Sequence, residues 1–297
     1  MATTRNKRPA ASRPSSKQKK IYTTVGDIPD SFRRDVLMRA FSDYSVALGR
    51  LKEGKYCPLG TGVLVKKGNR HGILTAHHCL HACTPEVSLG SEQGDTLALV
   101  LNRGCPVHVQ PIEAIEHVLA KSNTDEFGPD LTFIEILSIE RLGTFKAIGS
   151  FWSLDKPKAK ILKDFGSPLT PNVTIGFPEV HYDKIVDGPV TRHRIRHMTY
   201  QNAIKEGAVF EKDGWDYLDS TIYYPGDPDL PPSFSGLSGG PVWGMEIIHR
   251  KKTDTYEIGR SALIGITFFE IYRHGDEGRL RAHFINSIYD TAWSVLE

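Results

Sequence analysis

The segment Gly236–Pro241, with the sequence GLSGGP, constrains the backbone of this 297-residue chain more than any other stretch. Glycine reaches backbone conformations that a Cβ excludes, so a loop this rich in glycine allows main-chain N–H groups to converge on one point. Ser238 lies inside the loop, where such N–H groups would meet an anion that develops beside its hydroxyl. The segment therefore predicts either a serine prepared for acyl transfer or a flexible Ser/Gly turn.

A nucleophilic serine needs a histidine as its base and a carboxylate that orients the histidine. The segment 72–79 carries an apolar run into a turn of small residues that reaches His78. This pattern predicts a buried strand that delivers an imidazole to the edge of a core. Asp130 opens the segment 130–136, whose alternating apolar residues predict a strand with one buried face. An aspartate at the start of such a strand is dry enough to accept a strong imidazole N–H bond.

Three motifs, in the order histidine, aspartate, serine, resemble those of the chymotrypsin-like (trypsin-clan) serine peptidases, of the bacterial intracellular type. Thr75–Cys79 (TAHHC) is similar to the family's TAAHC block, Asp130–Ile134 (DLTFI) resembles its Asp-Leu/Ile-Ala-Leu-Leu block, and Gly236–Pro241 is similar to its GDSGGP block. Weaker matches at 60–65 and 173–178 support the resemblance, which covers roughly residues 55–297.

The resemblance implies an all-β fold: a double six-stranded antiparallel β-barrel (chymotrypsin-like) with an N-terminal and a C-terminal helix. It also implies that Ser238 is the nucleophile, His78 the general base and Asp130 the orienting carboxylate. The backbone N–H groups of Gly236 and Ser238 would form the oxyanion hole. The family's histidine directly precedes a cysteine, which favours His78 over the adjacent His77. Asp125 is the competing carboxylate, but its polar surroundings predict a solvated loop.

Leu237 departs from the family pattern, in which many secreted members have an aspartate before the serine. That aspartate pairs with a newly cleaved N-terminus and shapes the oxyanion loop. Leucine forms no ion pair, so we expect that the loop is held by other means. It is either formed constitutively or ordered by a partner or substrate.

The pocket that selects the substrate is predicted from its position relative to the nucleophile. Pro232 stands where trypsin-type members hold the charge that selects Lys or Arg. Thr267, Phe268 and Glu270 belong to the strand expected on the far wall. We therefore expect an apolar or medium-sized residue at the scissile position, unless a shifted loop brings Asp227 or Asp229 to the pocket floor.

Histidines and cysteines crowd the segment 77–83, which contains His77, His78, Cys79, His81 and Cys83. Zinc sites usually combine two separated groups of ligands, and the second group here would be Cys57 or Cys105. Because the triad already accounts for His78, we predict no metal and no cofactor. By resemblance to secreted relatives Cys57 and Cys79 would form a disulfide, whereas a reducing cytosol would keep both as thiols.

Residues 1–25 are expected to be a disordered basic tail, since positions 1–20 carry seven Lys and Arg and no acidic residue. Charge alone would suit nucleic acid or an anionic membrane, but we interpret so short a run as a solubilising tail. The tail lacks the apolar core of a signal peptide, and no later stretch approaches the ~18 apolar residues of a membrane span. A cytoplasmic location is therefore predicted.

Spacing of apolar residues by three and four predicts an amphipathic helix over 26–52 and a closing helix over 279–296. The peptidase domain, with its two barrels and the closing helix, is expected to span 53–297. A long polar and aromatic segment, 181–233, is interpreted as a substrate-contacting insertion or a solvated hairpin, the hairpin being favoured for the basic part around 192–197.

Together these features predict a serine endopeptidase that acts on polypeptides. Two alternatives remain. The first is a recognition or effector module whose triad is latent until an activating protein partner binds, and the second is an esterase or acyltransferase that uses the same chemistry.

Overall fold

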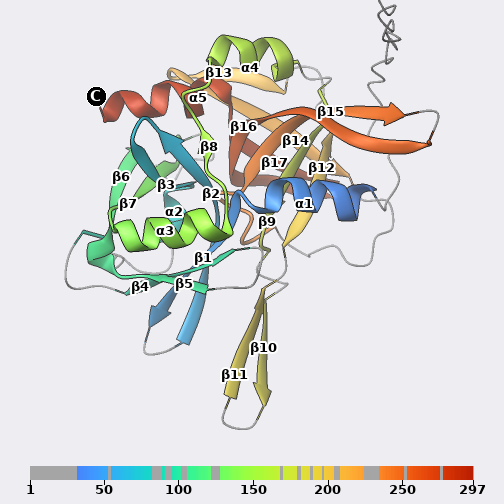
Figure 1. Ribbon diagram of the computed structural model, residues 1–297. Coiled ribbons are helices and arrows are strands. Elements are labelled where there is room, and N and C mark those ends of the chain that lie inside the picture. The colour runs from blue at the N-terminus through green and yellow to red at the C-terminus, as the bar shows by residue number, and fades with distance from the viewer. Residues whose placement is uncertain are drawn as a thin grey trace, which may run out of the picture.

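The computed structural model describes residues 32–52, 55–81, 89–90, 95–101, 106–121, 128–167, 170–178, 182–187, 190–195, 197–203, 208–223, 234–250, 253–274 and 277–296 (Figure 1). The predicted basic tail, 1–25, lies outside these ranges, as do Cys83, Cys105, Asp125, Asp227, Asp229 and Pro232.

The first sheet is built from the N-terminal half of the described chain. Its strands are β1 (Ser45–Lys52), β2 (Lys55–Lys67), β3 (Arg70–Thr75), β4 (Thr96–Leu101), β5 (Pro106–Val109), β6 (Ala114–Ala120), β7 (Leu131–Ile136) and β8 (Trp152–Ser153). The order is β5-β4-β1-β2-β3-β7-β6, all antiparallel, and the short β8 adds to β2 in parallel. Its interior is filled by aliphatic side chains such as Val46, Leu64 and Ile134.

The second sheet closes on itself. It contains β9 (Asn172–Gly176), β12 (Met198–Ala203), β13 (Val209–Lys212), β14 (Trp215–Tyr223), β15 (Pro241–Arg250), β16 (Thr255–His274) and β17 (Glu277–His283). The order is β12-β9-β15-β16-β17-β14-β13, and β12 also pairs with β14. That extra pairing joins six strands into a ring, to which β13 adds at β14. The all-β, double-barrel fold class is therefore confirmed, with eight and seven strands in the sheets instead of six in each.

The largest core cluster joins the two sheets. Leu74, Leu131 and Phe133 from the first sheet and Val242 and Ile266 from the second belong to it. Strand β7 is buried on both faces, because Ile134 points into the first barrel while Phe133 faces the shared core. The prediction of one buried face for 130–136 is therefore wrong, and the reason is that β7 lies between β3 and β6 at the junction of the two barrels.

The predicted N-terminal helix over 26–52 is wrong beyond its first half. A π-helical turn (Phe32–Leu37) leads into α1 (Met38–Ser42), and the chain then enters β1. Phe41, near the end of α1, stacks on Trp243, with ring centroids 4.9 Å apart. From Ser45 onwards, pairing with both β2 and β4 replaces helical hydrogen bonds.

The predicted closing helix over 279–296 is also too long, because its first residues belong to β17. That strand pairs with β14 and β16, so backbone bonds to two neighbours prevail over the helical spacing. The helical part is α5 (Ile285–Tyr289) followed by a 3-10 turn (Thr291–Val295).

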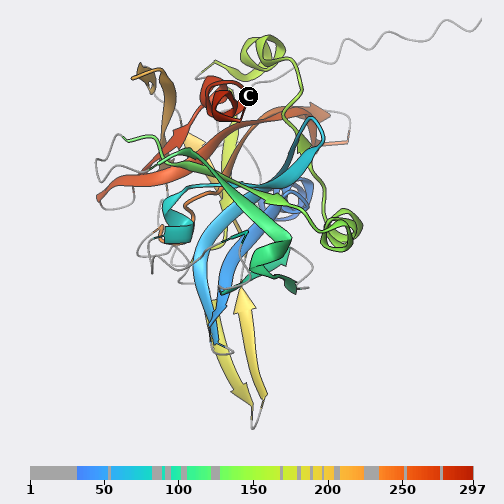
Figure 2. The ribbon, with the colours of Figure 1, turned by 90° about the vertical axis from the view of Figure 1, so that its left-hand side faces the viewer.

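The remaining helices lie outside the sheets. They are α2 (His78–His81), α3 (Ile139–Ile148), α4 (Lys158–Phe165) and a 3-10 turn (Pro111–Glu113). The hairpin favoured for the basic part of 181–233 is formed by β10 (Tyr182–Asp187) and β11 (Val190–Ile195). Both views show this hairpin projecting away from the two sheets (Figures 1 and 2). In the described part of the chain no helix is long and apolar enough to cross a membrane.

Candidate active site

His78 and Asp130 meet because their strands are neighbours. Strand β3 pairs with β7 so that Thr75 lies opposite Thr132, which brings the end of β3 next to the start of β7. Helix α2 begins at His78. The backbone N–H of His78 donates a 3.0 Å hydrogen bond to Oδ1 of Asp130. Nδ1 of the same residue is hydrogen-bonded to Oδ2 of Asp130. When a carboxylate accepts the Nδ1–H of a neutral histidine, the lone pair lies on Nε2, where a general base needs it.

Two successive tight turns meet at Leu237, and Ser238 is the second residue of the second turn. The N–H of Leu237 donates to the carbonyl of Phe234 (2.9 Å), and that of Gly240 donates to the carbonyl of Leu237 (2.8 Å). Gly236 and Gly239 occupy the third positions of these turns with φ of +89° and +81°, which identifies both as type II. The glycines of the segment are therefore required by its backbone.

Thr61 ties this loop to the first barrel. Its backbone N–H donates to the carbonyl of Ser238 (2.8 Å), and its hydroxyl donates to the carbonyl of Gly236 (2.7 Å). The thiol of Cys79, the residue after His78, donates to the same Ser238 carbonyl at 3.3 Å. The serine loop and the histidine turn thus share a hydrogen-bonded boundary between the two barrels.

Leu237 anchors the loop on its other side. The side chain is 1% exposed and packs in a separate apolar cluster with Tyr200, Ile222, Phe234 and Leu280. Apolar packing on one side and Thr61 on the other hold the loop without an ion pair at position 237. The N–H groups of Gly236 and Ser238 make no hydrogen bond within the described residues, so both are available to an oxyanion.

His283 is a member of the site that sequence reasoning missed. Its Nε2 accepts a 3.0 Å hydrogen bond from the backbone N–H of Asp130. Burial lowers the pKa of His283 to about 4, so the imidazole is neutral at physiological pH. A lone histidine at the end of a strand carries no motif, and its closeness to Asp130 follows from how the two sheets pack.

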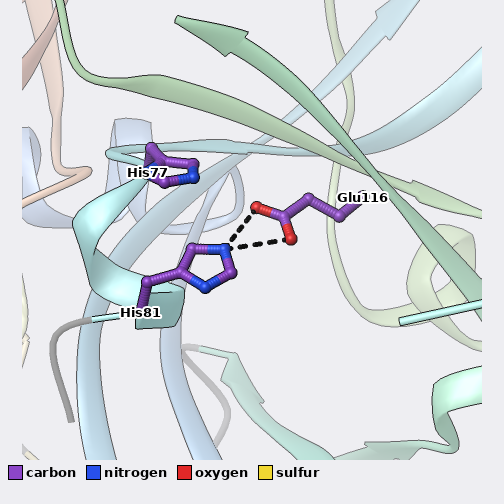
Figure 3. A group of neighbouring side chains, drawn as sticks. All are labelled: His77, His81 and Glu116. Carbon is purple, nitrogen blue, oxygen red and sulfur yellow. Dashed lines mark hydrogen bonds and ion pairs between the residues drawn. The ribbon is translucent and has the colours of Figure 1, made fainter. Parts of the chain in front are cut away.

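The side chain of His77 does not face the carboxylate of Asp130, as that of His78 does. Its ring stacks on that of His81, with centroids 4.4 Å apart, and burial together with the neighbouring His81 lowers its pKa. The structure therefore places His78, and not His77, against Asp130. In the described residues one group of three side chains is arranged as metal ligands could be, namely His77, His81 and Glu116 (Figure 3).

The predicted pocket residues have different surroundings. Thr267 lies beside the loop, since its N–H donates to the Gly240 carbonyl and its carbonyl accepts from the Gly239 N–H. Phe268 is buried and stacks on His283. Glu270 accepts a 3.1 Å bond from the backbone N–H of Phe234 and so supports the first turn of the loop. Their role in selecting a substrate stays a prediction.

Cys57 and Cys79 are both free thiols, so the disulfide implied by the resemblance is not formed. Burial raises the pKa of Cys79 to about 12, which keeps this thiol protonated. Cys79 therefore acts as a hydrogen-bond donor to Ser238 and is a poor nucleophile.

Comparison of the chain with known proteins found similar solved structures but no matching family model or curated protein. Among solved structures it is similar to the "Rv3671c protease, inactive form", with 12% identity over 90% of this chain and 96% of the other, at a TM-score of 0.45. A second similar structure is described as "Aromatic interactions drive the coupled folding and binding of the intrinsically disordered Sesbania mosaic virus VPg protein". It has 14% identity over 82% of this chain and 88% of the other, at a TM-score of 0.40. At these values neither similarity assigns a function.

Proposed function

We propose that this chain is a serine endopeptidase that hydrolyses peptide bonds through an acyl-enzyme on Ser238. The observation that carries the proposal is the pair of hydrogen bonds between His78 and Asp130, beside a loop whose serine carbonyl is bonded to Cys79 and Thr61. The side chain of Asp130 is 5% exposed, which strengthens its bond to the imidazole, while that of His78 is 34% exposed and accessible to a substrate.

In the first step Oγ of Ser238 attacks the scissile carbonyl carbon, and Nε2 of His78 takes the hydroxyl proton. The carbonyl π electrons move to the oxygen, which the N–H groups of Gly236 and Ser238 stabilise. Collapse of this intermediate breaks the C–N bond, and His78 gives its proton to the leaving amine. Water then repeats the sequence on the ester and releases the acid. Each oxyanion donor of this kind contributes about 3 kcal/mol to the transition state.

The loop geometry supports a site that is formed before substrate binds. In a type II turn the central peptide is reversed relative to a type I turn, and the N–H of Gly236 belongs to that peptide. A positive φ at Gly236 together with bonds from Thr61 favours this constitutive form over a latent effector module that waits for a partner.

Labelling by a fluorophosphonate tests the proposal. The purified, untagged chain should incorporate about one equivalent of probe without any partner, and Ser238→Ala should abolish both labelling and hydrolysis of a mixed peptide library. Ser235→Ala, which changes an exposed serine of the same loop, is the matched control and should label normally. Labelling that persists in Ser238→Ala would contradict the assignment of Ser238 as the nucleophile. Labelling that appears only in lysate supports the latent module instead.

A further inference from the structure

Two histidines and a glutamate lie together beside helix α2, and none of them takes part in the proposed hydrolysis (Figure 3). His77 directly precedes α2 and His81 ends it, and a separation of four residues places both on one face of a helical turn. Glu116 reaches them from β6. Each residue offers one ligand atom, and these three atoms all lie within 4.8 Å of one another.

The carboxylate of Glu116 is held toward the histidines. Its two oxygens lie 3.0 and 3.1 Å from Nε2 of His81. The hydroxyl of Thr132 lies 3.0 Å from both Oε1 of Glu116 and the carbonyl oxygen of His117, and its one proton is shared between these two acceptors. Second partners of this kind are the usual support of a metal-binding carboxylate.

His77 is the member of the group that lacks a partner of its own. It is 7% exposed, and within the described residues no hydrogen bond reaches its ring nitrogens. Figure 3 shows the ring edge of His77 turned toward the carboxylate of Glu116. Neither ring nitrogen of His77 is sealed from solvent, so a lone pair of the neutral ring is available to a metal ion.

Against the sequence-based prediction of no metal, which considered only Cys57 or Cys105 as the second group of ligands, we propose that His77, His81 and Glu116 bind a zinc ion. Zinc takes imidazole nitrogen and carboxylate oxygen at about 2.0–2.2 Å, and three protein ligands with one water complete its tetrahedron. Ligand atoms around such an ion lie about 3.3 Å apart, so the His81 ring must tilt out of its stack on His77. The side chain of His81 is 32% exposed, which leaves room for that movement and for the water.

The surrounding charge favours a cation. Glu116 and Asp130 place negative charge near His77, and Lys121 places one positive charge there. Hard cations such as Mg²⁺ and Ca²⁺ prefer oxygen ligands, whereas two imidazoles suit zinc. Since His78 lies between His77 and His81 in the chain, a bound zinc ion would also stiffen the turn that carries His78. The zinc site does not depend on whether Ser238 is a nucleophile.

Direct binding of zinc to the untagged full chain, freed of metal by a chelator, tests the proposal. Calorimetry should show one equivalent bound with a micromolar or tighter Kd, together with a rise in Tm of several degrees, and Mg²⁺ should give neither. Glu116→Gln and His81→Gln should each weaken zinc binding by about 10–100-fold. Circular dichroism and Tm in chelator establish that both variants fold.

Two further variants serve as controls. His249 makes a 2.8 Å bond to the exposed Asp254 and stands for an isolated histidine–carboxylate pair, so His249→Gln should bind zinc as the wild type does. His78→Gln should also keep its affinity. The proposal is overturned if the wild type binds no zinc at about 100 µM, if folded Glu116→Gln and His81→Gln bind normally, or if His78→Gln abolishes binding and so places the ion at the triad.

Discussion

The backbone N–H of Asp130 donates a 3.0 Å hydrogen bond to Nε2 of His283, a residue 153 positions later in the chain. Asp130 precedes β7 of the first sheet and His283 ends β17 of the second, so this bond links the two barrels at the proposed triad. Because the accepting nitrogen carries no proton, His283 has its proton on Nδ1. We expect His283 to position Asp130 without touching the substrate.

The variant His283→Phe tests this role. Phenylalanine keeps a planar ring, although a larger one, and leaves the N–H of Asp130 buried without an acceptor, which costs about 1–3 kcal/mol of stability. Asp130 then holds His78 less firmly, so we expect kcat to fall about tenfold or more while KM changes little. Chemical denaturation and steady-state kinetics measure the two effects.

A second buried histidine provides the matched control for His283→Phe. His197 is also buried (8% exposed), its ring is tilted against that of Phe177, and neither ring nitrogen has a partner within the described residues. His197→Phe should therefore leave kcat unchanged and stability equal or higher. An equal fall of kcat in both variants would mean that His283 acts only through general stability.

Acid should destabilise the protein through these same two imidazoles. Burial lowers the pKa of both His197 and His283 to about 4, from about 6.5 in the unfolded chain. Between these two pKa values the folded state binds fewer protons than the unfolded state. The two neutral imidazoles therefore contribute fully to the free energy of unfolding above pH ~6.5. As the pH falls toward 4, that free energy decreases by roughly 3 kcal/mol for each imidazole. The urea midpoint should fall over this window, and the double variant His197→Phe/His283→Phe should flatten the fall. A double variant that is as acid-sensitive as the wild type would assign the effect to carboxylates.

How much of the site is readable from sequence depends on whether a residue belongs to a motif. His78, Asp130 and Ser238 were selected by chain order and by their neighbours, and the structure brings the first two into contact. His283 has no motif because its role arises from the packing of one sheet on the other. The role of the Thr61 hydroxyl is also hidden in the sequence. The segment 60–65 predicts a strand, but a strand pattern does not reveal which side chain will reach a distant loop.

The errors at the two ends of the fold share one cause. Residues 45–52 and 279–283 lie within the ranges predicted to be helical, but each segment lies between two neighbouring strands of its sheet. Pairing on both edges gives the backbone groups of these segments partners in other strands, which the spacing within a segment does not indicate. Tertiary context therefore overrode the local pattern in both places.

Thr61→Val removes the hydroxyl that serves two partners in the loop region. The hydroxyl donates to the carbonyl of Gly236 (2.7 Å) and accepts from the N–H of Phe177 (3.0 Å), while valine keeps the shape. We expect a loss of about 1–3 kcal/mol of stability and a several-fold slower reaction with the fluorophosphonate. Thr144→Val, which changes a hydroxyl on α3, should leave the labelling rate unchanged. A wild-type rate in Thr61→Val would show that the backbone bond from residue 61 is sufficient.

Gly239→Ala should be among the most damaging single-methyl changes. A Cβ at this position would lie 1.9 Å from the carbonyl oxygen of Thr61 and 2.0 Å from the hydroxyl oxygen of Thr75. The loop must then move, so we expect labelling to be lost together with more than about 3 kcal/mol of stability. Gly214 has a nearly equal φ, +79°, with open space around its Cβ position, so Gly214→Ala should cost only about 1 kcal/mol and keep full labelling. Similar losses in both variants would attribute the effect to backbone strain alone.

Leu237→Asp introduces the residue that many secreted chymotrypsin-like peptidases have before their nucleophile, and we expect it to abolish labelling of this chain. The position is 1% exposed and packs against the apolar and aromatic side chains of Tyr200, Phe234 and Leu280. Burying an unpaired charge there costs several kcal/mol, so the loop should leave its pocket and labelling should fall at least a hundredfold. Leu237→Met preserves volume and polarity and should cost less than about 1.5 kcal/mol with labelling intact. If Leu237→Asp reacts with the probe as fast as the wild type, apolar anchoring does not hold the loop, and Thr61 alone must account for its shape.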